Sequence, residues 1–182
     1  MDSKWTLAAW LCALVGLVCL VGAAGADSKK LDRERAAVRQ VAYTFVGWAL
    51  DDKNVDALKA SLSHGDDFFM FQPDSRSTVA GYQEFLKLIP GWMNPEFRAT
   101  KTELREVKVD ISKSGDFAWF SSLLEDCGEV KGRAACWKDC RYTGVLEKRE
   151  GRWVIVQAHF SLASDKVVEE YKQRQTASSP TP

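Results

Sequence analysis

The C-terminal half of the chain alternates between apolar and polar residues with a period of two, and this pattern restricts the possible folds most. Four such runs follow one another, at about residues 107–111, 117–126, 135–148 and 152–163. Lys131-Gly132 and Glu150-Gly151 stand between the last three runs, where tight hairpin turns are expected. Alternation of this kind is typical of antiparallel strands with one buried face. We therefore expect a long antiparallel meander in this half.

The region before the meander has the spacing of amphipathic helices. The apolar positions of the first helix are Leu31, Val38, Val41, Ala42, Phe45 and Ala49. Asn54 is placed to cap a short second helix. A strand is expected at 68–71, and the apolar stripe that follows predicts a third helix from about Thr78 to Leu88, ended by Pro90-Gly91. Three N-terminal helices followed by an antiparallel sheet predict an α+β fold.

The N-terminus has the pattern of an export signal. Residues 5–24 are apolar or small and carry no charge, and Ala24-Gly25-Ala26 provides the small residues that a signal peptidase requires. We expect a signal peptide over 1–26, a domain over 27–165, and a flexible C-terminal tail over 166–182. The mature protein would then be secreted or periplasmic and free of the membrane. The alternative is an uncleaved membrane anchor, since about 20 apolar residues span a bilayer.

The charge balance excludes some classes of partner. The chain has 25 Lys and Arg residues against 25 Asp and Glu residues, with no basic stripe. Nucleic-acid binding requires a basic surplus, so we expect no nucleic-acid partner. The sequence also contains no phosphate-binding, dinucleotide-binding or zinc-protease motif, and we expect neither a cofactor nor a metal.

Pairing the last three strands through the two tight turns predicts their register. In this register Tyr142 lies opposite both His159 and Ser121, while Gly144 lies opposite Gln157. One face then carries Trp119, Ser121, Leu123, Cys140, Tyr142, Gly144, Leu146, Trp153, Ile155, Gln157, His159 and Ser161. The other carries Phe120, Leu124, Trp137, Arg141, Thr143, Val145, Val154, Val156 and Phe160. A single bulge would exchange part of these two sets.

Three cysteines remain after the signal segment. The predicted register places Cys127 directly opposite Cys136, in a non-hydrogen-bonded pair where side chains approach closely enough for a disulfide. The alternatives are a Cys136–Cys140 bond, three reduced thiols, or a zinc site, for which the cysteine spacing is unusual. Cys140 is interpreted as a small buried residue rather than a nucleophile.

Several stretches resemble the SnoaL-like domains of the nuclear-transport-factor-2-like superfamily, over about residues 33–165. They are Tyr43-Thr44-Phe45, Val79-Ala80-Gly81-Tyr82, Gly115-Asp116-Phe117-Ala118-Trp119, Tyr142-Thr143-Gly144-Val145-Leu146 and the final strand from Gly151 to Ser161. The resemblance implies a cone, in which helices pack on a strongly curved antiparallel sheet around a cavity. It also implies a homodimer formed through the sheet. Members include isomerases, cyclases, dehydratases and proteins without catalysis, so the fold does not determine the function.

His159 is the main candidate for chemistry, because a histidine near neutral pH serves as acid or base. Tyr142 is expected beside it as an oxyanion partner. The predicted ligand-binding residues are Trp119, Ser121, Tyr142, Gln157 and His159. Trp48, Trp153 and Phe71 suit an apolar ligand but are also typical of an ordinary core. Asp66, Asp67 and Asp74 are interpreted as turn or rim residues, and His64 as an exposed loop residue.

Three functional hypotheses follow. The first is an exported domain that binds a small, largely apolar molecule in its cavity without catalysis. The second is an isomerase, cyclase or dehydratase that uses His159 and Tyr142. The third is a homodimeric interaction module whose contact face carries Arg141, Thr143, Val145 and Phe160.

Overall fold

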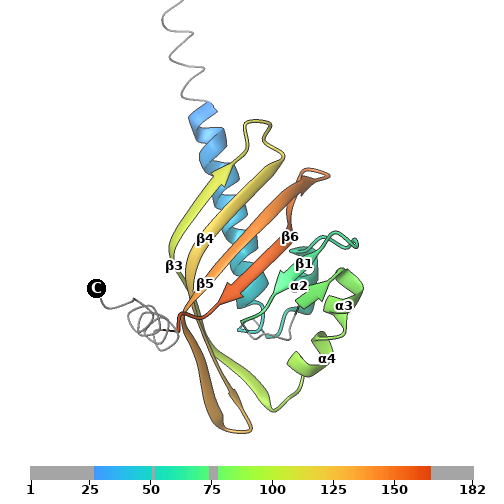
Figure 1. Cartoon of the computed structure of the whole chain (residues 1–182), viewed down its shortest axis with the longest axis vertical. Coiled ribbons are helices and arrows are strands. Elements are labelled where there is room, and N and C mark those ends of the chain that lie inside the picture. Colours follow the sequence, from blue (N-terminus) through green and yellow to red (C-terminus); the bar gives the residue numbers. More distant parts are fainter. Residues whose placement is uncertain (1–26, 51, 74–77, 165–182) are drawn as a thin grey trace, which may run out of the picture. The chain divides into compact units, whose positions relative to one another are not determined.

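The computed structural model describes residues 27–50, 52–73 and 78–164 (Figure 1). The signal peptide expected over 1–26 and the tail expected over 166–182 lie outside these residues. The chain divides into two units, residues 1–37 and 38–182. In the first unit, residues 27–37 are helical and carry an Arg35–Asp32 ion pair at 3.8 Å. Among the described residues, no helix has both the length and the apolar character needed to cross a membrane.

The second unit is built on a six-stranded sheet with the order β2-β1-β6-β5-β4-β3 (Figure 1). Its strands are β1 (Phe69–Phe71), β2 (Thr78–Ala80), β3 (Phe97–Ile111), β4 (Phe117–Val130), β5 (Arg133–Arg149) and β6 (Arg152–Ser161). The meander from β3 to β6 is antiparallel, as predicted, and β2 pairs antiparallel with β1. The β1–β6 pair is parallel, so the sheet is mixed and the expectation of a purely antiparallel sheet was wrong.

Helical residues cover the inner face of this sheet. In the second unit the helical residues 38–47 contribute the apolar side chains of Val38, Ala42 and Phe45 to the buried core. The short helix α2 (Val55–Ala60) is capped by Asn54, whose side-chain oxygen accepts a hydrogen bond from the Ala57 amide at 3.0 Å. This contact confirms the predicted cap and its physical reason, an otherwise unpaired helical amide.

The third predicted helix, over 78–88, is wrong in part. Its first residues form β2, and α3 (Tyr82–Leu86) begins only after Gly81, whose φ of +88° favours glycine. The Gly81 amide donates to the Phe68 carbonyl at 2.7 Å, which fixes this turn. Pro90 lies at the start of a further helix, α4 (Ile89–Trp92), instead of ending the previous one. Proline is tolerated there because first-turn amides have no helical partner.

Bulges changed the predicted register of the last three strands. Cys127 lies opposite Cys136, as predicted, but the register shifts between Leu124 and Asp126, near Asp139 with its φ of +53°. Beyond this shift, Tyr142 pairs with Ser122 instead of Ser121. A second shift leaves one extra residue, Val156, in β6.

The second bulge moves the end of β6 by one residue relative to the predicted pairs. Tyr142 therefore lies opposite Phe160, Gly144 opposite Ala158, and His159 opposite Thr143. Because each one-residue shift exchanges the two faces of a strand, the predicted pairing of Tyr142 with His159 was wrong. Phe160 is buried on the inner face and does not join Arg141, Thr143 and Val145 on the outer face.

Tyr142 lies at the centre of the core, with no exposed surface. Its hydroxyl group donates to the Ala42 carbonyl at 3.3 Å, and its ring stacks on Phe160 with centroids 4.6 Å apart. Tyr142 of the sheet therefore contacts the helix directly.

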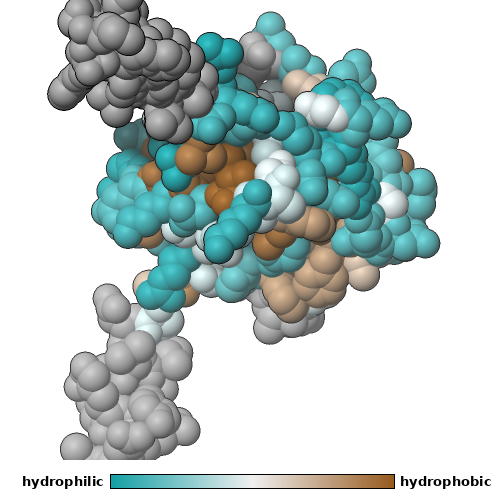
Figure 2. Space-filling model, turned by 90° about the horizontal axis from the view of Figure 1, so that it is seen from above, coloured by the Kyte–Doolittle hydropathy of each residue, from teal (hydrophilic) through white to brown (hydrophobic). Residues whose placement is uncertain are grey.

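On the surface drawn in Figure 2, hydrophobic residues gather in small areas bordered by hydrophilic residues.

Candidate functional site

A cavity of about 200 Å³ lies between the helical residues and the inner face of the sheet. For comparison, a dry cavity of about 150 Å³ holds one benzene molecule. Six aromatic side chains contribute to its wall: Phe45, Trp48, Trp92, Phe97, Trp137 and Phe160. The cavity is therefore suited in size and lining to a molecule with about one ring.

The aromatic rings of the wall are held by contacts with one another. Trp48 and Trp92 come from the helical side, with ring centroids 6.2 Å apart. Trp137 of β5 and Phe160 of β6 come from the sheet, with centroids 6.1 Å apart. Tilted and edge contacts at these separations are favourable for aromatic pairs, so each ring supports the position of its neighbour.

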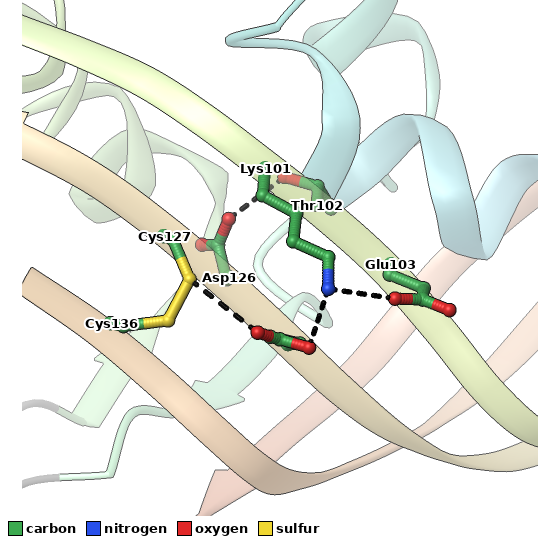
Figure 3. Close-up of a disulfide and its surroundings, with 7 residues drawn as sticks. Lys101, Thr102, Glu103, Asp126, Cys127 and Cys136 are labelled. Carbon is green, nitrogen blue, oxygen red and sulfur yellow. Dashed lines mark hydrogen bonds and ion pairs between the residues drawn. A yellow bond between two sulfur atoms is a disulfide. The ribbon is translucent and has the colours of Figure 1, made fainter.

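Among the lining residues that the structure describes, Asp126 is the one ionisable residue. Its Oδ1 atom accepts a hydrogen bond from the Thr102 hydroxyl group at 2.8 Å (Figure 3). Burial raises the pKa of the Asp126 carboxyl group, and the Thr102 hydrogen bond offsets part of that effect. No Lys or Arg of the described segments forms an ion pair with this carboxyl group. The carboxyl group is therefore able to hold or transfer a proton, or to bind a polar ligand atom.

The pKa of the preceding residue, Glu125, is shifted in the opposite direction to that of Asp126. Its carboxylate lies near Lys101, whose Nζ atom is 2.7 Å from Glu125 and 3.0 Å from Glu103 (Figure 3). The hydrogen bond from Lys101 lowers the pKa of Glu125. Successive side chains of a strand point to opposite faces, so two adjacent carboxyl groups have different surroundings. Only Asp126 belongs to the cavity wall.

The cysteines lie beside this wall. In the structure Cys127 and Cys136 form a disulfide between β4 and β5 (Figure 3). Their sulfur atoms and a Glu125 oxygen lie within 4.8 Å of one another, but bonded sulfurs are not thiolate ligands for a metal. Cys140 is buried, and burial raises the pKa of its thiol, which opposes a nucleophilic role.

Four of the five predicted ligand-binding residues lie on the outer face of the sheet. Trp119, Ser121 and Gln157 line a hollow of about 370 Å³ on that face, together with Lys108, Asp110, Thr143 and Val145. His159 follows on the same face, with its ring 5.8 Å from that of Phe71. Tyr142 is the exception, because it is buried on the inner face. Whether any of the five binds a ligand stays a prediction.

Of the acidic residues considered from the sequence, the described ones, Asp66 and Asp67, lie outside the cavity wall. Asp67 is paired with Arg149 and accepts a hydrogen bond from the Ser63 hydroxyl group at 2.7 Å, and these contacts lower the pKa of its carboxyl group. Asp66 is exposed and Asp74 lies outside the described residues. Asp126 was missed, although it shares the alternation of Phe120 and Leu124 along β4. A polar residue in the apolar set of a strand was the available signal.

Comparison with known proteins places this geometry in a family. The chain matches the SnoaL-like domain over residues 38–165. Comparison with curated protein sequences gave no match.

The fold is similar to several solved structures. A candidate dehydratase from the NTF2-like family of Streptomyces avermitilis is 15% identical, with a TM-score of 0.61, covering 73% of this chain and 99% of that one. An NTF2-like protein from Cytophaga hutchinsonii is 16% identical, with a TM-score of 0.55, covering 71% and 98%. A ketosteroid isomerase-like protein from Erwinia carotovora atroseptica is 20% identical, with a TM-score of 0.54, covering 72% and 97%.

At these identities the likeness shows the fold, and the activity of each neighbour remains its own. The match over 38–165 spans the helical residues 38–47, the six strands and the cavity wall. This chain therefore belongs to the SnoaL-like domain family, with the NTF2-like α+β fold.

Proposed function

We propose that this domain binds a small, largely apolar molecule in the aromatic cavity, and that Asp126 contacts the polar atom of that molecule. The observation that carries the proposal is a single carboxyl group within an aromatic wall. Ligand sites commonly combine an apolar lining with a few polar groups that fix orientation. The rings would supply apolar contact, and Asp126 would set the direction of the bound molecule.

The test is a titration of the purified protein with a panel of one-ring compounds, followed by calorimetry and thermal shift. Asp126→Asn is expected to weaken binding at least tenfold while the fold is retained. His159→Ala is the matched variant on the outer face and is expected to leave the affinity unchanged. A loss in His159→Ala with full binding in Asp126→Asn would instead assign the ligand to the outer face.

A second candidate function is acid–base catalysis of the isomerase or dehydratase type. It is favoured by the raised pKa of Asp126, since such shifts gather at catalytic groups. The version that relied on a Tyr142–His159 contact has no support, because the two residues do not pair.

Exchange of the α-protons of a cyclic ketone in D₂O, followed by NMR, tests the catalytic candidate. The protein is expected to accelerate this exchange, and Asp126→Asn is expected to abolish the acceleration. Binding of the ketone without faster exchange would leave the binding proposal in place and remove the catalytic one.

We also propose that the chain is exported and forms a homodimer through the outer face of its sheet. Trp119 on this face is 49% exposed and Phe71 is 45% exposed, and apolar residues exposed together on one sheet face are a common feature of protein–protein interfaces. Light scattering is expected to show a dimer that Trp119→Glu dissociates.

N-terminal sequencing of the mature protein is expected to start at Asp27, and a retained N-terminus would contradict export with cleavage.

A further inference from the structure

The Asp126 carboxyl group in the cavity has no cationic partner among the residues that the structure describes. Along the described segments, nearby basic side chains pair with other acids: Lys101 with Glu103 and Glu125, and Arg105 with Asp139. The hydrogen-bond partner of Asp126 is the Thr102 hydroxyl group, which donates to Oδ1. A hydroxyl group that donates to a carboxyl oxygen favours its ionised form, whereas burial without a cation disfavours that form. The site therefore holds an acid whose negative charge is incompletely compensated.

The wall around this acid includes six aromatic rings beside aliphatic residues and Gln72, and aromatic rings attract cations. Three of the six aromatic residues are tryptophans, whose indole faces bind cations most strongly. One lining ring already has such a contact, because the Lys53 ammonium group lies 5.3 Å from the centroid of Phe97. The same ammonium group donates to the Asn94 carbonyl at 2.7 Å and is held there. The aromatic rings and the Asp126 carboxylate thus both attract positive charge.

We propose that the ligand is a small organic cation, an amine or quaternary ammonium compound with no more than about one ring. This inference rests on the proposed function and names the chemical class that the cavity takes. The cationic nitrogen would face Asp126, and its alkyl or aryl groups would contact the tryptophans. A neutral molecule of the same shape would fill the same space but would leave the buried carboxylate without a cationic partner.

Two isosteric pairs of probes separate charge from shape. Choline and 3,3-dimethylbutan-1-ol differ in a nitrogen that is replaced by carbon, and benzylamine and benzyl alcohol differ in the charged group. Calorimetry with the purified protein at neutral pH is expected to give at least tenfold tighter binding of the cation in each pair. Asp126→Asn is expected to bring the cation and the neutral molecule to similar affinities.

Glu125→Gln is the matched control, because it removes the adjacent negative charge outside the cavity wall and is expected to preserve the preference. Trp92→Leu is a second variant, which keeps an apolar side chain but removes the indole ring, and it is expected to weaken cation binding more than neutral binding.

Each result decides between the proposals. Equal or tighter binding of the neutral probes to the wild type would overturn the cation inference and leave the proposed function standing. Binding of neither class would overturn both. A cation preference that survives Asp126→Asn but is lost in Glu125→Gln would place the cation outside the cavity and overturn the inference.

Discussion

At the scale of single residues, the main contrast is between two adjacent carboxyl groups. Glu125 shares an ammonium group with Glu103 on one side of β4, whereas Asp126 has a hydroxyl partner and an aromatic wall on the other. Ionisation is favoured at the first position and disfavoured at the second. A buried acid without a cation reduces stability, and such residues are retained where a function requires them.

Asp126→Asn is expected to stabilise the ligand-free protein at pH 7. The folded protein has the higher Asp126 pKa, so it binds more protons than the unfolded chain between the usual value of 3.8 and the raised value. The free energy of unfolding contributed by Asp126 therefore falls as pH rises through this window. The Asp126→Asn variant keeps a hydrogen-bond acceptor for Thr102. Its amide does not titrate, so its unfolding free energy does not decrease in this way as pH rises.

Thermal unfolding at pH 3 to 8 checks this prediction. A gain of about 1 kcal/mol moves the midpoint of a domain of this size by about 2–4 °C. Glu125→Gln is the control, and no gain is expected there because Lys101 stabilises the Glu125 carboxylate. A lower midpoint for Asp126→Asn than for wild type at pH 7 would contradict the interpretation that the Asp126 carboxylate destabilises the ligand-free protein.

At the scale of elements, two bulges decide which side chains reach the cavity. The sequence pattern predicted the strands of the meander, the two tight turns and the Cys127–Cys136 pair, and all of these are observed. It did not predict the bulges near Asp139 and at Val156, because the alternation of apolar and polar residues does not reveal a single inserted residue. His159 was therefore assigned to the wrong face.

Gly144 allows close packing where β5 crosses the core. A Cβ atom at this position would lie 2.6 Å from Cε1 of Phe120 and 2.9 Å from the Gln157 carbonyl oxygen. Gly144→Ala is expected to cost about 1–3 kcal/mol of unfolding free energy through overpacking. Gly91→Ala is the control, since nothing lies within 4 Å of its Cβ position. Denaturant unfolding measures both, and equal stability of the two variants would refute this explanation.

The hairpin at the end of β4 and β5 depends on the cysteine pair next to the cavity wall. Cys127 directly follows Asp126 in β4, and Cys136 directly precedes Trp137 in β5. Asp126 and Trp137 lie opposite each other across the two strands. Replacing both cysteines by serine is expected to cost about 2–3 kcal/mol of unfolding free energy. Urea unfolding under oxidising conditions checks this, with peptide mapping of the wild type to identify the bond. A Cys136–Cys140 peptide would contradict the pairing.

At the scale of the whole molecule, family and fold class were accessible from the sequence, whereas the site was not. Motifs such as Tyr142 to Leu146 and the final strand are local, and local pattern suffices to recognise the family. The parallel β1–β6 pair and the cavity wall join residues far apart in the chain, such as Trp48, Phe97 and Asp126. Their meeting depends on long-range packing, which periodicity does not encode.

The most direct test of the central claim is a crystal structure of the protein soaked with benzylamine or with another one-ring compound that binds. We expect density for the ring among Trp48, Trp92 and Trp137, with its polar atom within hydrogen-bond distance of the Asp126 carboxyl group. Density confined to the outer face beside Trp119 and His159, or a cavity filled by rearranged side chains, would contradict the account.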